Sequence, residues 1–327
     1  MLQKIDVDYN NTILDIVHLK VYFPAKRARL FRRGYVQAVD DVSLSIKKNT
    51  LYGLIGESGS GKTTLGRAIV MLERPTAGKI LFDGKNIWRL HGPDLKNFRR
   101  SVQMVFQDPF AALNPLWTVF KNLSLPLSVH GVTDKKAMRK LCIQALAEVK
   151  LGPEYLEKFP HELSGGERQR ICIARAVILK PKLIVADEPT SMIDASLKGD
   201  ICKLFLELQK KYNMSCLFIS HEINVAQKLS NRTIIMYLGK IVETLPTSQQ
   251  TEEYLHPYSK LLMYGTDYTI PDEVILSFKG EIPSALAPPS GCRFHTRCIY
   301  ATAECKTQAP PLLEVKPEHF VACFLYS

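Results

Sequence analysis

The chain has 327 residues, of which 46% are hydrophobic, so it is long enough for about two domains with sizeable cores. Its 43 Lys and Arg residues outnumber its 32 Asp and Glu residues, and the formal net charge of +11 is compatible with nucleic acid, anionic lipid or phosphate ligands. No apolar stretch is long enough to cross a bilayer, and the polar N-terminal segment is unlike a signal peptide. We therefore expect a chain that neither spans a membrane nor is secreted.

Three alternating apolar segments predict β-strands near the start of the chain, at residues 13–23, 38–46 and 51–56. A basic segment separates the first two, and its cationic residues are Lys26, Arg27, Arg29, Arg32 and Arg33. We expect a solvated loop here, with lipid head groups as the alternative partner.

A glycine-rich loop follows the third strand and precedes a helical segment at residues 65–72. The loop consists of Gly56, Glu57, Ser58, Gly59, Ser60, Gly61, Lys62, Thr63 and Thr64. Its glycines let successive backbone N–H groups point at the β- and γ-phosphates of a nucleotide, while Lys62 neutralises their charge and Thr63 offers a hydroxyl ligand to Mg²⁺. The strand, loop and helix together favour a phosphate-binding loop over a glycine turn without a ligand.

The middle of the chain predicts an α/β fold. Residues 134–151 carry apolar side chains at helical spacing, which indicates an amphipathic helix. Residues 183–186 and 216–220 are short, continuously apolar segments, as in parallel strands that are buried on both faces. The alternation of strands and helices places the core in the α/β class.

Two adjacent acids, Asp187 and Glu188, follow the strand at residues 183–186. Neighbouring positions on an extended chain point to opposite sides, so the two carboxylates can take different roles. We expect Asp187 to reach the Mg²⁺ shell and Glu188 to act as the general base that polarises the attacking water. A solvated strand end is the alternative for such a pair on its own.

Two further polar residues follow apolar strands. Gln107 ends the segment SVQMVFQ and His221 follows CLFIS. Ligands bind at the carboxyl edge of open α/β sheets. In a chain without a phosphate loop, a His or Gln at such a position would usually have a structural role. Because this chain has one, we expect His221 to contact the γ-phosphate and Gln107 to bind Mg²⁺ or the lytic water.

The segment LSGGERQR opens a helix in which Ser164 and Glu167 have capping-box spacing. Gly165 and Gly166 leave the helix N-terminus bare, so that its N–H groups and dipole can receive an anion. The glycine-rich loop at residues 56–64 already provides a binding site for the phosphates of this chain's own nucleotide. The second anion site therefore suits the ATP of another subunit, although a well-capped helix also explains the pattern.

From Leu255 onwards the regular apolar spacing is lost and proline becomes frequent, which predicts an irregular tail. This tail contains four of the eight cysteines, Cys292, Cys298, Cys305 and Cys323. Five, six and seventeen residues separate them, a spacing that fits zinc poorly. Four thiolates can also hold an iron–sulfur cluster, and Arg293, His295 and Arg297 would offset its charge. Scattered core cysteines remain the alternative.

The motifs GESGSGKTT, VFQ, LSGGERQR, VADEP, the loop Ser191–Asp194 and His221 occur in this order over residues 12–250, and the chain resembles ABC-type ATPases. VFQDPFAALNP, HPYSKLL and the terminal cysteines are similar to the ATP-binding subunits of oligopeptide/dipeptide permeases. The resemblance implies a RecA-like P-loop ATPase core, an antiparallel β subdomain and an inserted helical subdomain at about 108–178. It places the ATPase domain at 1–250 and an irregular C-terminal extension at 251–327.

The resemblance also implies site residues and cofactors. An aromatic side chain should stack on adenine, and Phe23 fits best, with Tyr22 and Tyr35 as alternatives. The cofactors would be ATP, Mg²⁺ and a 4Fe-4S cluster held by the four tail cysteines, with zinc as the alternative. Ser191-Met192-Ile193-Asp194 replaces the Ser-Ala-Leu-Asp common in the family but keeps Asp194.

We therefore expect an ATPase subunit of an ABC importer for peptides or a similar solute, peripheral at the cytoplasmic face of the cell membrane. Its partners would be a second, related ATPase in a heterodimer, two membrane permease subunits and an extracytoplasmic binding protein, with no nucleic acid. The alternative is a soluble ABC ATPase that acts on nucleic acid or ribosomes. The single cassette, without coiled-coil or ferredoxin-like additions, argues against it.

Overall fold

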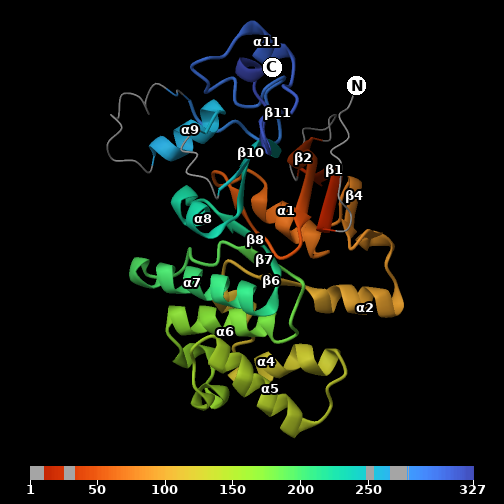
Figure 1. Ribbon diagram of the computed structural model, residues 1–327, viewed down its shortest axis with the longest axis vertical. Helices are drawn as coiled ribbons and strands as arrows, with labels where there is room; N and C mark the ends of the chain where they lie inside the picture. Colours follow the sequence, from red (N-terminus) through yellow and green to blue (C-terminus); the bar gives the residue numbers. More distant parts are fainter. Residues whose placement is uncertain (1–10, 26–33, 248–253, 266–277, 279) are drawn as a thin grey trace. The chain divides into compact units, whose positions relative to one another are not determined.

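A computed structural model describes residues 11–25, 34–247, 254–265, 278 and 280–327 (Figure 1). The basic segment at residues 26–33 lies outside the described residues. The chain forms two compact units. Unit 1 comprises the described residues up to Ile13, Ile46–Leu51 and Phe82–Phe218, and unit 2 comprises Leu14–Ser45, Tyr52–Leu81 and Ile219–Ser327.

Unit 1 contains a parallel strand pair and most of the helices. Strand β6 pairs in parallel with β7, and Val105 lies opposite Ala186. Strand β8 is the other neighbour of β7 in the sheet. The helices and strands that lie mainly in this unit are β5 (Lys85–Asn86), α2 (Gly92–Ser101), β6 (Val102–Val105), α3 (Pro109–Ala112), α4 (Val119–Val129), α5 (Lys135–Glu148), α6 (Gly165–Val177), β7 (Leu183–Asp187), α7 (Ala195–Tyr212) and β8 (Ser215–Ser220). Three short 3₁₀ helices accompany them: η1 (Ile87–Arg89), η2 (Pro153–Glu157) and η3 (Pro160–Glu162).

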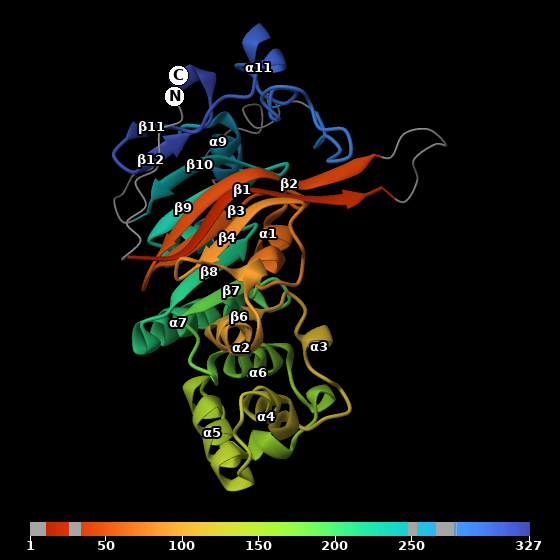
Figure 2. The ribbon, with the colours of Figure 1, turned by 90° about the vertical axis from the view of Figure 1, so that its right-hand side faces the viewer.

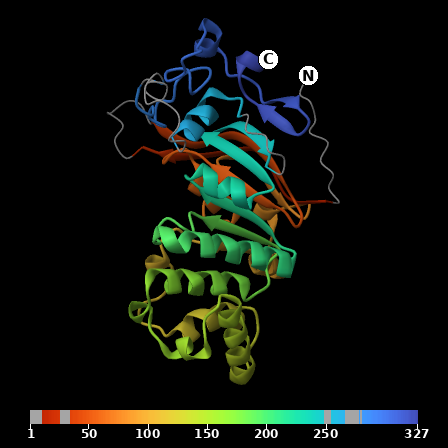
Figure 3. The same cartoon turned by 60° about the vertical axis from the view of Figure 1, so that its left-hand side comes forward.

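The inserted helical segment packs around α6, whose faces contact α4 and α5. These helices form one group, drawn in yellow and light green in Figure 3. The predicted amphipathic helix is confirmed as α5, where Asp134 caps the N-terminus by accepting hydrogen bonds from the N–H groups of Lys136 and Ala137. Cys142, Ala145 and Leu146 form its buried face. The apolar spacing in the sequence thus selects the surface that packs into the helical group.

Unit 2 contains the three predicted N-terminal strands and the tail. Its elements are β1 (Thr12–Pro24), β2 (Tyr35–Lys47), β3 (Leu51–Ile55), α1 (Lys62–Ile69), β4 (Ala77–Phe82), α8 (Ile223–Leu229), β9 (Arg232–Tyr237), β10 (Lys240–Pro246), α9 (Pro257–Tyr264), α11 (Ala303–Thr307), β11 (Leu313–Lys316), β12 (His319–Val321) and η4 (Phe324–Tyr326). One sheet contains the order β2-β1-β4, and the other contains β11-β12-β10-β9-β3 (Figure 2). Strands β3 and β9 are parallel, whereas β9, β10, β12 and β11 are successively antiparallel.

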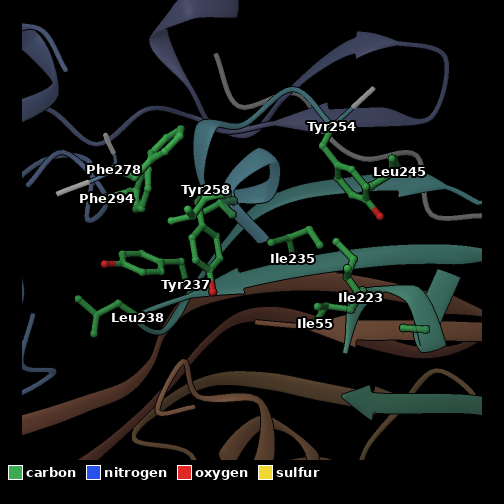
Figure 4. Close-up of a cluster of buried hydrophobic side chains, with 13 residues drawn as sticks. Ile55, Ile223, Ile235, Tyr237, Leu238, Leu245, Tyr254, Tyr258, Phe278 and Phe294 are labelled. Atoms are coloured by element: carbon green, nitrogen blue, oxygen red, sulfur yellow. The ribbon is translucent and has the colours of Figure 1, made fainter. Parts of the chain in front are cut away.

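The tail contributes both strands and core side chains to unit 2. The sequence did not predict the β11–β12 hairpin, in which Val321 and Phe320 of β12 pair with Glu243 and Thr244 of β10. Within residues 280–312, all of which the structure describes, α11 is the only helix or strand, as expected of an irregular segment. Phe294 from this segment is buried in a cluster with Tyr237 and Tyr258 (Figure 4). No helix in the described part of the chain combines the length and apolar character needed to cross a bilayer.

Candidate functional site

The glycine loop joins strand β3 to helix α1, as the sequence predicts. Gly61 is the residue before the helix and has φ 102°, a left-handed conformation that disfavours other residues. Gly56 is required for a different reason, since a Cβ there would lie 2.1 Å from the carbonyl oxygen of Met236. The backbone of the loop therefore takes a shape that side chains at these two positions would prevent.

Lys62 begins α1 and folds back over the loop. Its ammonium donates hydrogen bonds of 2.6 Å to the carbonyl oxygen of Gly56 and 2.9 Å to that of Glu57. The residue is only 4% exposed, so its charge lies in a buried setting where it acts strongly on a bound anion. Ser58 and Gly59 are exposed, so the tip of the loop faces solvent.

The two acids come at the end of β7 in unit 1. Asp187 is the last residue of the strand and is 2% exposed. Glu188 has φ 44°, so the backbone turns into the left-handed region directly after Asp187. The argument from extended-chain alternation is therefore wrong for Glu188: a turn of the backbone, not strand geometry, directs its carboxylate. A non-glycine residue in this conformation stores strain of the kind that often occurs at active sites.

Gln107 lies beside Glu188. Its side-chain amide donates a hydrogen bond of 3.1 Å to Oε2 of Glu188. The register of β6 and β7 explains the contact, because Val105 lies opposite Ala186 and each polar residue comes two positions later. Two residues that are 81 positions apart in the sequence thus form one polar pair.

His221 follows β8 and belongs to unit 2, the unit that contains the glycine loop. Its imidazole is about half exposed, and its Nε2 lies 3.9 Å from Oε1 of Glu222. Asp187, Glu188 and Gln107 belong to unit 1, whereas Lys62, Thr63, Thr64 and His221 belong to unit 2.

The capping box at the start of α6 is confirmed. The N–H of Glu167 donates to the hydroxyl of Ser164 at 3.3 Å, and the N–H of Ser164 donates to Oε2 of Glu167 at 2.8 Å. The Tyr155 hydroxyl donates to the other carboxylate oxygen and, with Ser164, lowers the pKa of Glu167. Glu167 therefore stays ionised and keeps the end of the helix, including Gly165 and Gly166, in place.

Sequence reasoning missed two residues that support this helix end. Arg168 is 4% exposed, and it donates hydrogen bonds to the carbonyl oxygens of Pro160 and Leu163. Its guanidinium also lies over the ring of Phe110, 3.4 Å from the ring centre. Tyr155 lies in a short 3₁₀ helix, and nothing in its sequence neighbourhood distinguishes it from a surface tyrosine.

Two family models match the chain. Residues 39–191 match the model for the ABC transporter, and residues 242–305 match the model for the oligopeptide/dipeptide transporter C-terminal region. The chain is 45% identical to the oligopeptide transport ATP-binding protein AppF of Bacillus subtilis, over 97% of this chain and 98% of that protein. The chain belongs to the ABC transporter ATPase family.

Other similar proteins agree with this membership. A di/tripeptide transport ATP-binding protein, DppF of Pseudomonas aeruginosa, is 36% identical over 95% of this chain and 97% of its own length. Among solved structures, the dimeric ATP-binding cassette MJ0796 is similar with a TM-score of 0.65 and 28% identity, over 72% of this chain and 100% of that structure. The expected P-loop ATPase fold is confirmed.

Three aromatic residues are candidates for adenine stacking in this ABC ATPase. The hydroxyl of Tyr22 donates to Asp40, and burial together with Asp40 raises the pKa of Tyr22 to about 12. Tyr35 is 47% exposed, and Phe23 is partly buried near the end of β1. Asp40 thus holds the hydroxyl of Tyr22, and Tyr35 is the most exposed of the three rings.

The four tail cysteines of the ABC ATPase line one cavity of about 110 Å³, together with His256 and His295. Burial raises the pKa values of Cys292 and Cys323 to about 11 each, and the pKa of Cys298 is also raised. In the described part of the chain, no set of three or more His, Cys, Asp or Glu side chains has the geometry of a metal site. The structure thus brings the four thiols around one cavity without arranging them as ligands.

The expectation that Arg293 and Arg297 offset the negative charge of a cluster held by the tail cysteines is wrong. Arg293 binds Asp40 at 2.6 Å and Gln37 at 2.7 Å. Arg297 binds the carboxylate of Glu57 in the phosphate loop. Both arginines are therefore committed to acidic or polar groups of the ATPase core, and of the three predicted cations only His295 lines the cavity.

Proposed function

We propose that this chain is the ATP-hydrolysing subunit of an ABC importer that takes up oligopeptides, dipeptides or a similar small solute. The observation that carries the proposal is the 45% identity to an oligopeptide transport ATP-binding protein over 97% of the chain. The match of residues 242–305 to the C-terminal region of oligopeptide/dipeptide transporters supports the same class. Nothing in these likenesses favours action on nucleic acid or ribosomes.

The glycine loop would bind the phosphates of ATP. The backbone N–H groups from Gly59 to Thr64 would receive the β- and γ-phosphate oxygens, and the ammonium of Lys62 would move from its loop carbonyls to the same oxygens. An aromatic ring at Phe23, or at Tyr35, would stack on adenine. Mg²⁺, when bound with ATP, neutralises the developing phosphate charge, and Thr63, Asp187 and Gln107 supply hydroxyl, carboxylate and amide oxygens that suit it.

Hydrolysis would use the Glu188 carboxylate as general base. The oxygen of water attacks the γ-phosphorus, the bond to the β–γ bridging oxygen breaks, and the water proton moves to Glu188, leaving ADP and phosphate. The hydrogen bond from Gln107 supports this role because it holds one carboxylate oxygen of Glu188 in a fixed orientation. His221 would contact the γ-phosphate.

The helix end at Ser164, Gly165, Gly166 and Glu167, of which Ser164 is exposed, would receive the γ-phosphate of ATP bound to a second, related ATPase. The dimeric state of the similar cassette MJ0796 supports this arrangement. Closure of two subunits on two ATP molecules, followed by opening after hydrolysis, would drive two membrane permease subunits between inward-open and outward-open states. The chain would be peripheral at the cytoplasmic face of the membrane, and an extracytoplasmic binding protein would deliver the solute.

The tail would hold a 4Fe-4S cluster through Cys292, Cys298, Cys305 and Cys323, with zinc as the alternative. Their shared cavity supports this role. Burial raises the pKa of Cys292, Cys298 and Cys323 and so favours their protonated form, and bound iron or zinc would have to displace these protons and compensate the charge of the thiolates. The cluster would stabilise a tail that has few helices or strands of its own.

Peptide uptake by cells that carry the chain tests the proposal. Glu188→Gln would be introduced into the chromosomal copy, and uptake of isotopically labelled dipeptides and pentapeptides would be compared with uptake of a free amino acid. We expect peptide uptake to fall at least tenfold and amino-acid uptake to stay the same. Unchanged uptake of every peptide, with the variant protein present at the normal level, would exclude peptide import.

A further inference from the structure

A salt bridge connects the tail to the phosphate loop. Nη1 of Arg297 lies 2.7 Å from Oε2 of Glu57, and Nη2 lies 3.1 Å from Oε1. The two parallel hydrogen bonds form a bidentate pair, the strongest arrangement of an arginine and a carboxylate. The side chains are only 10% and 25% exposed, so solvent screens the pair weakly.

The packing around Arg297 fixes the guanidinium. Its central carbon lies 5.6 Å from the ring centre of Phe294 and 5.8 Å from that of Tyr237. Both rings are 1% exposed and belong to the cluster in Figure 4. Burial alone would lower the pKa of Arg297, but the hydrogen bonds and charges of Glu57 and Tyr237 together outweigh burial and raise the pKa, so the arginine remains charged.

A second contact holds the same loop residue from α9. The backbone N–H of Glu57 donates a hydrogen bond of 2.8 Å to the hydroxyl of Tyr258, a residue with no exposed surface. The carbonyl oxygen of Glu57 in turn accepts a hydrogen bond from Lys62. The side chain, N–H and carbonyl of one loop residue are thus all bonded, two of them to residues beyond position 250.

Arg297 neutralises the negative charge of Glu57, which would otherwise oppose nucleotide binding. A carboxylate at the second position of a phosphate loop repels the triphosphate that the loop would bind. The bidentate contact neutralises this carboxylate and holds it against the tail. Arg297 thereby removes an electrostatic penalty from nucleotide binding without touching the nucleotide.

We propose that Arg297 is a positioning residue for ATP binding, which acts through Glu57 and makes the tail part of the nucleotide site. The inference rests on the proposed function, because it requires the loop to bind ATP. The tail therefore sets the affinity of the loop for nucleotide, and the chemistry of the phosphates stays with the core residues.

Binding of MgATP to the full chain tests this role in a double-mutant cycle. We expect Arg297→Ala to raise the Kd for MgATP roughly tenfold because it leaves Glu57 unpaired near the phosphates. In the Glu57→Gln background the same substitution should change Kd by less than about threefold, since no carboxylate remains to be neutralised. At saturating ATP, Arg297→Ala should keep kcat within about twofold of wild type while KM rises.

Arg232→Ala is the matched control. Arg232 also joins the core to the tail, through Glu318, but it lies opposite Tyr52 at the start of β3, away from the loop. We expect this control to leave the Kd for MgATP unchanged. Arg297→Lys retains the charge without the bidentate geometry and should give an intermediate Kd.

Two results would overturn the inference. One is an Arg297→Ala chain that binds MgATP as tightly as wild type. The other is a loss of affinity on Arg297→Ala that is as large in the Glu57→Gln background as in the wild-type background, which would indicate loosened packing only.

The variant Lys62→Ala distinguishes failure of this inference from failure of the proposed function. A wild-type chain that does not bind MgATP rejects the proposed function, whereas loss of binding in Lys62→Ala with unchanged binding in Arg297→Ala rejects only the role of Arg297.

Discussion

The amide of Gln107 donates a hydrogen bond of 3.1 Å to Oε2 of Glu188. Each residue comes two positions after a register pair of the parallel strands β6 and β7, so the sheet brings the two segments together and the turn at Glu188 directs its carboxylate. One carboxylate oxygen is bonded in this way, which orients the proposed base before any substrate is present.

Replacement of Glu188 by Gln should reduce ATP hydrolysis by roughly 10² or more and leave ATP binding within about threefold of wild type. The amide cannot accept the proton of the attacking water, and the phosphate loop is unchanged. Phosphate release and MgATP binding by the full chain measure the two effects. Glu207→Gln, at an exposed residue of α7 paired with Lys150, is the control and should hydrolyse ATP normally. Turnover of Glu188→Gln within a factor of about three of wild type would rule out this base.

Replacement of Gln107 by Ala should lower kcat by roughly tenfold, because Glu188 loses the group that orients it. The KM for ATP should change by less than about threefold if Gln107 acts mainly on the base. Gln144→Ala removes an exposed amide from α5 in the same unit and serves as the control. A variant with wild-type kcat would show that the hydrogen bond does not contribute to catalysis.

Sequence patterns predicted the parts of the fold that depend on neighbouring residues. The glycine loop, the amphipathic helix at α5 and the capping box of Ser164 and Glu167 all depend on residues within a few positions of one another. The pairing of Arg297 with Glu57 joins residues 240 positions apart. No local pattern indicates such a partner, and the position of Arg297 beside Cys298 suggested a role at the thiols instead.

The hairpin of β11 and β12 was missed for a related reason. Its strands have four and three residues, too few for an alternating pattern to be distinct, and the prolines before them favour irregular structure. They become strands because β10 offers an edge on which β12 can pair. The turn at Glu188 was also beyond sequence reasoning, since a glutamate gives no sign of a left-handed backbone.

His256 predicts a pH dependence of stability. It is 1% exposed, its Nδ1 accepts a hydrogen bond from the N–H of Tyr258, and burial lowers its pKa to about 4, with the charge of Glu243 offsetting only part of the effect. The unfolded chain binds a proton at His256 below about pH 6.5, whereas the folded chain does so only near pH 4. The free energy of unfolding should therefore fall by about 2 kcal/mol between pH 8 and pH 5 on account of this residue.

The variant His256→Asn isolates that contribution, because asparagine can still cap α9 but does not titrate. Urea unfolding of both chains at pH 8 and pH 5 should give a smaller loss of stability for the variant, by about 2 kcal/mol. The exposed His91, replaced by Asn, should behave like wild type. An identical pH dependence in His256→Asn and wild type would mean that His256 is protonated in the folded chain.

The tail cysteines give the last prediction. If they bind a 4Fe-4S cluster, chain purified without oxygen should be brown and contain about four iron and four sulfide per chain. Cys298→Ser should abolish the colour, whereas Cys202→Ala, in α7, should retain it. Because Arg297 and Phe294 lie in the same segment and pack on Tyr237, loss of the cluster should also lower the melting temperature of the tail and weaken MgATP binding. Stoichiometric zinc without iron would decide for the alternative metal, and chain free of both metals, with all four thiols open to alkylation in the folded state, would exclude a metal site.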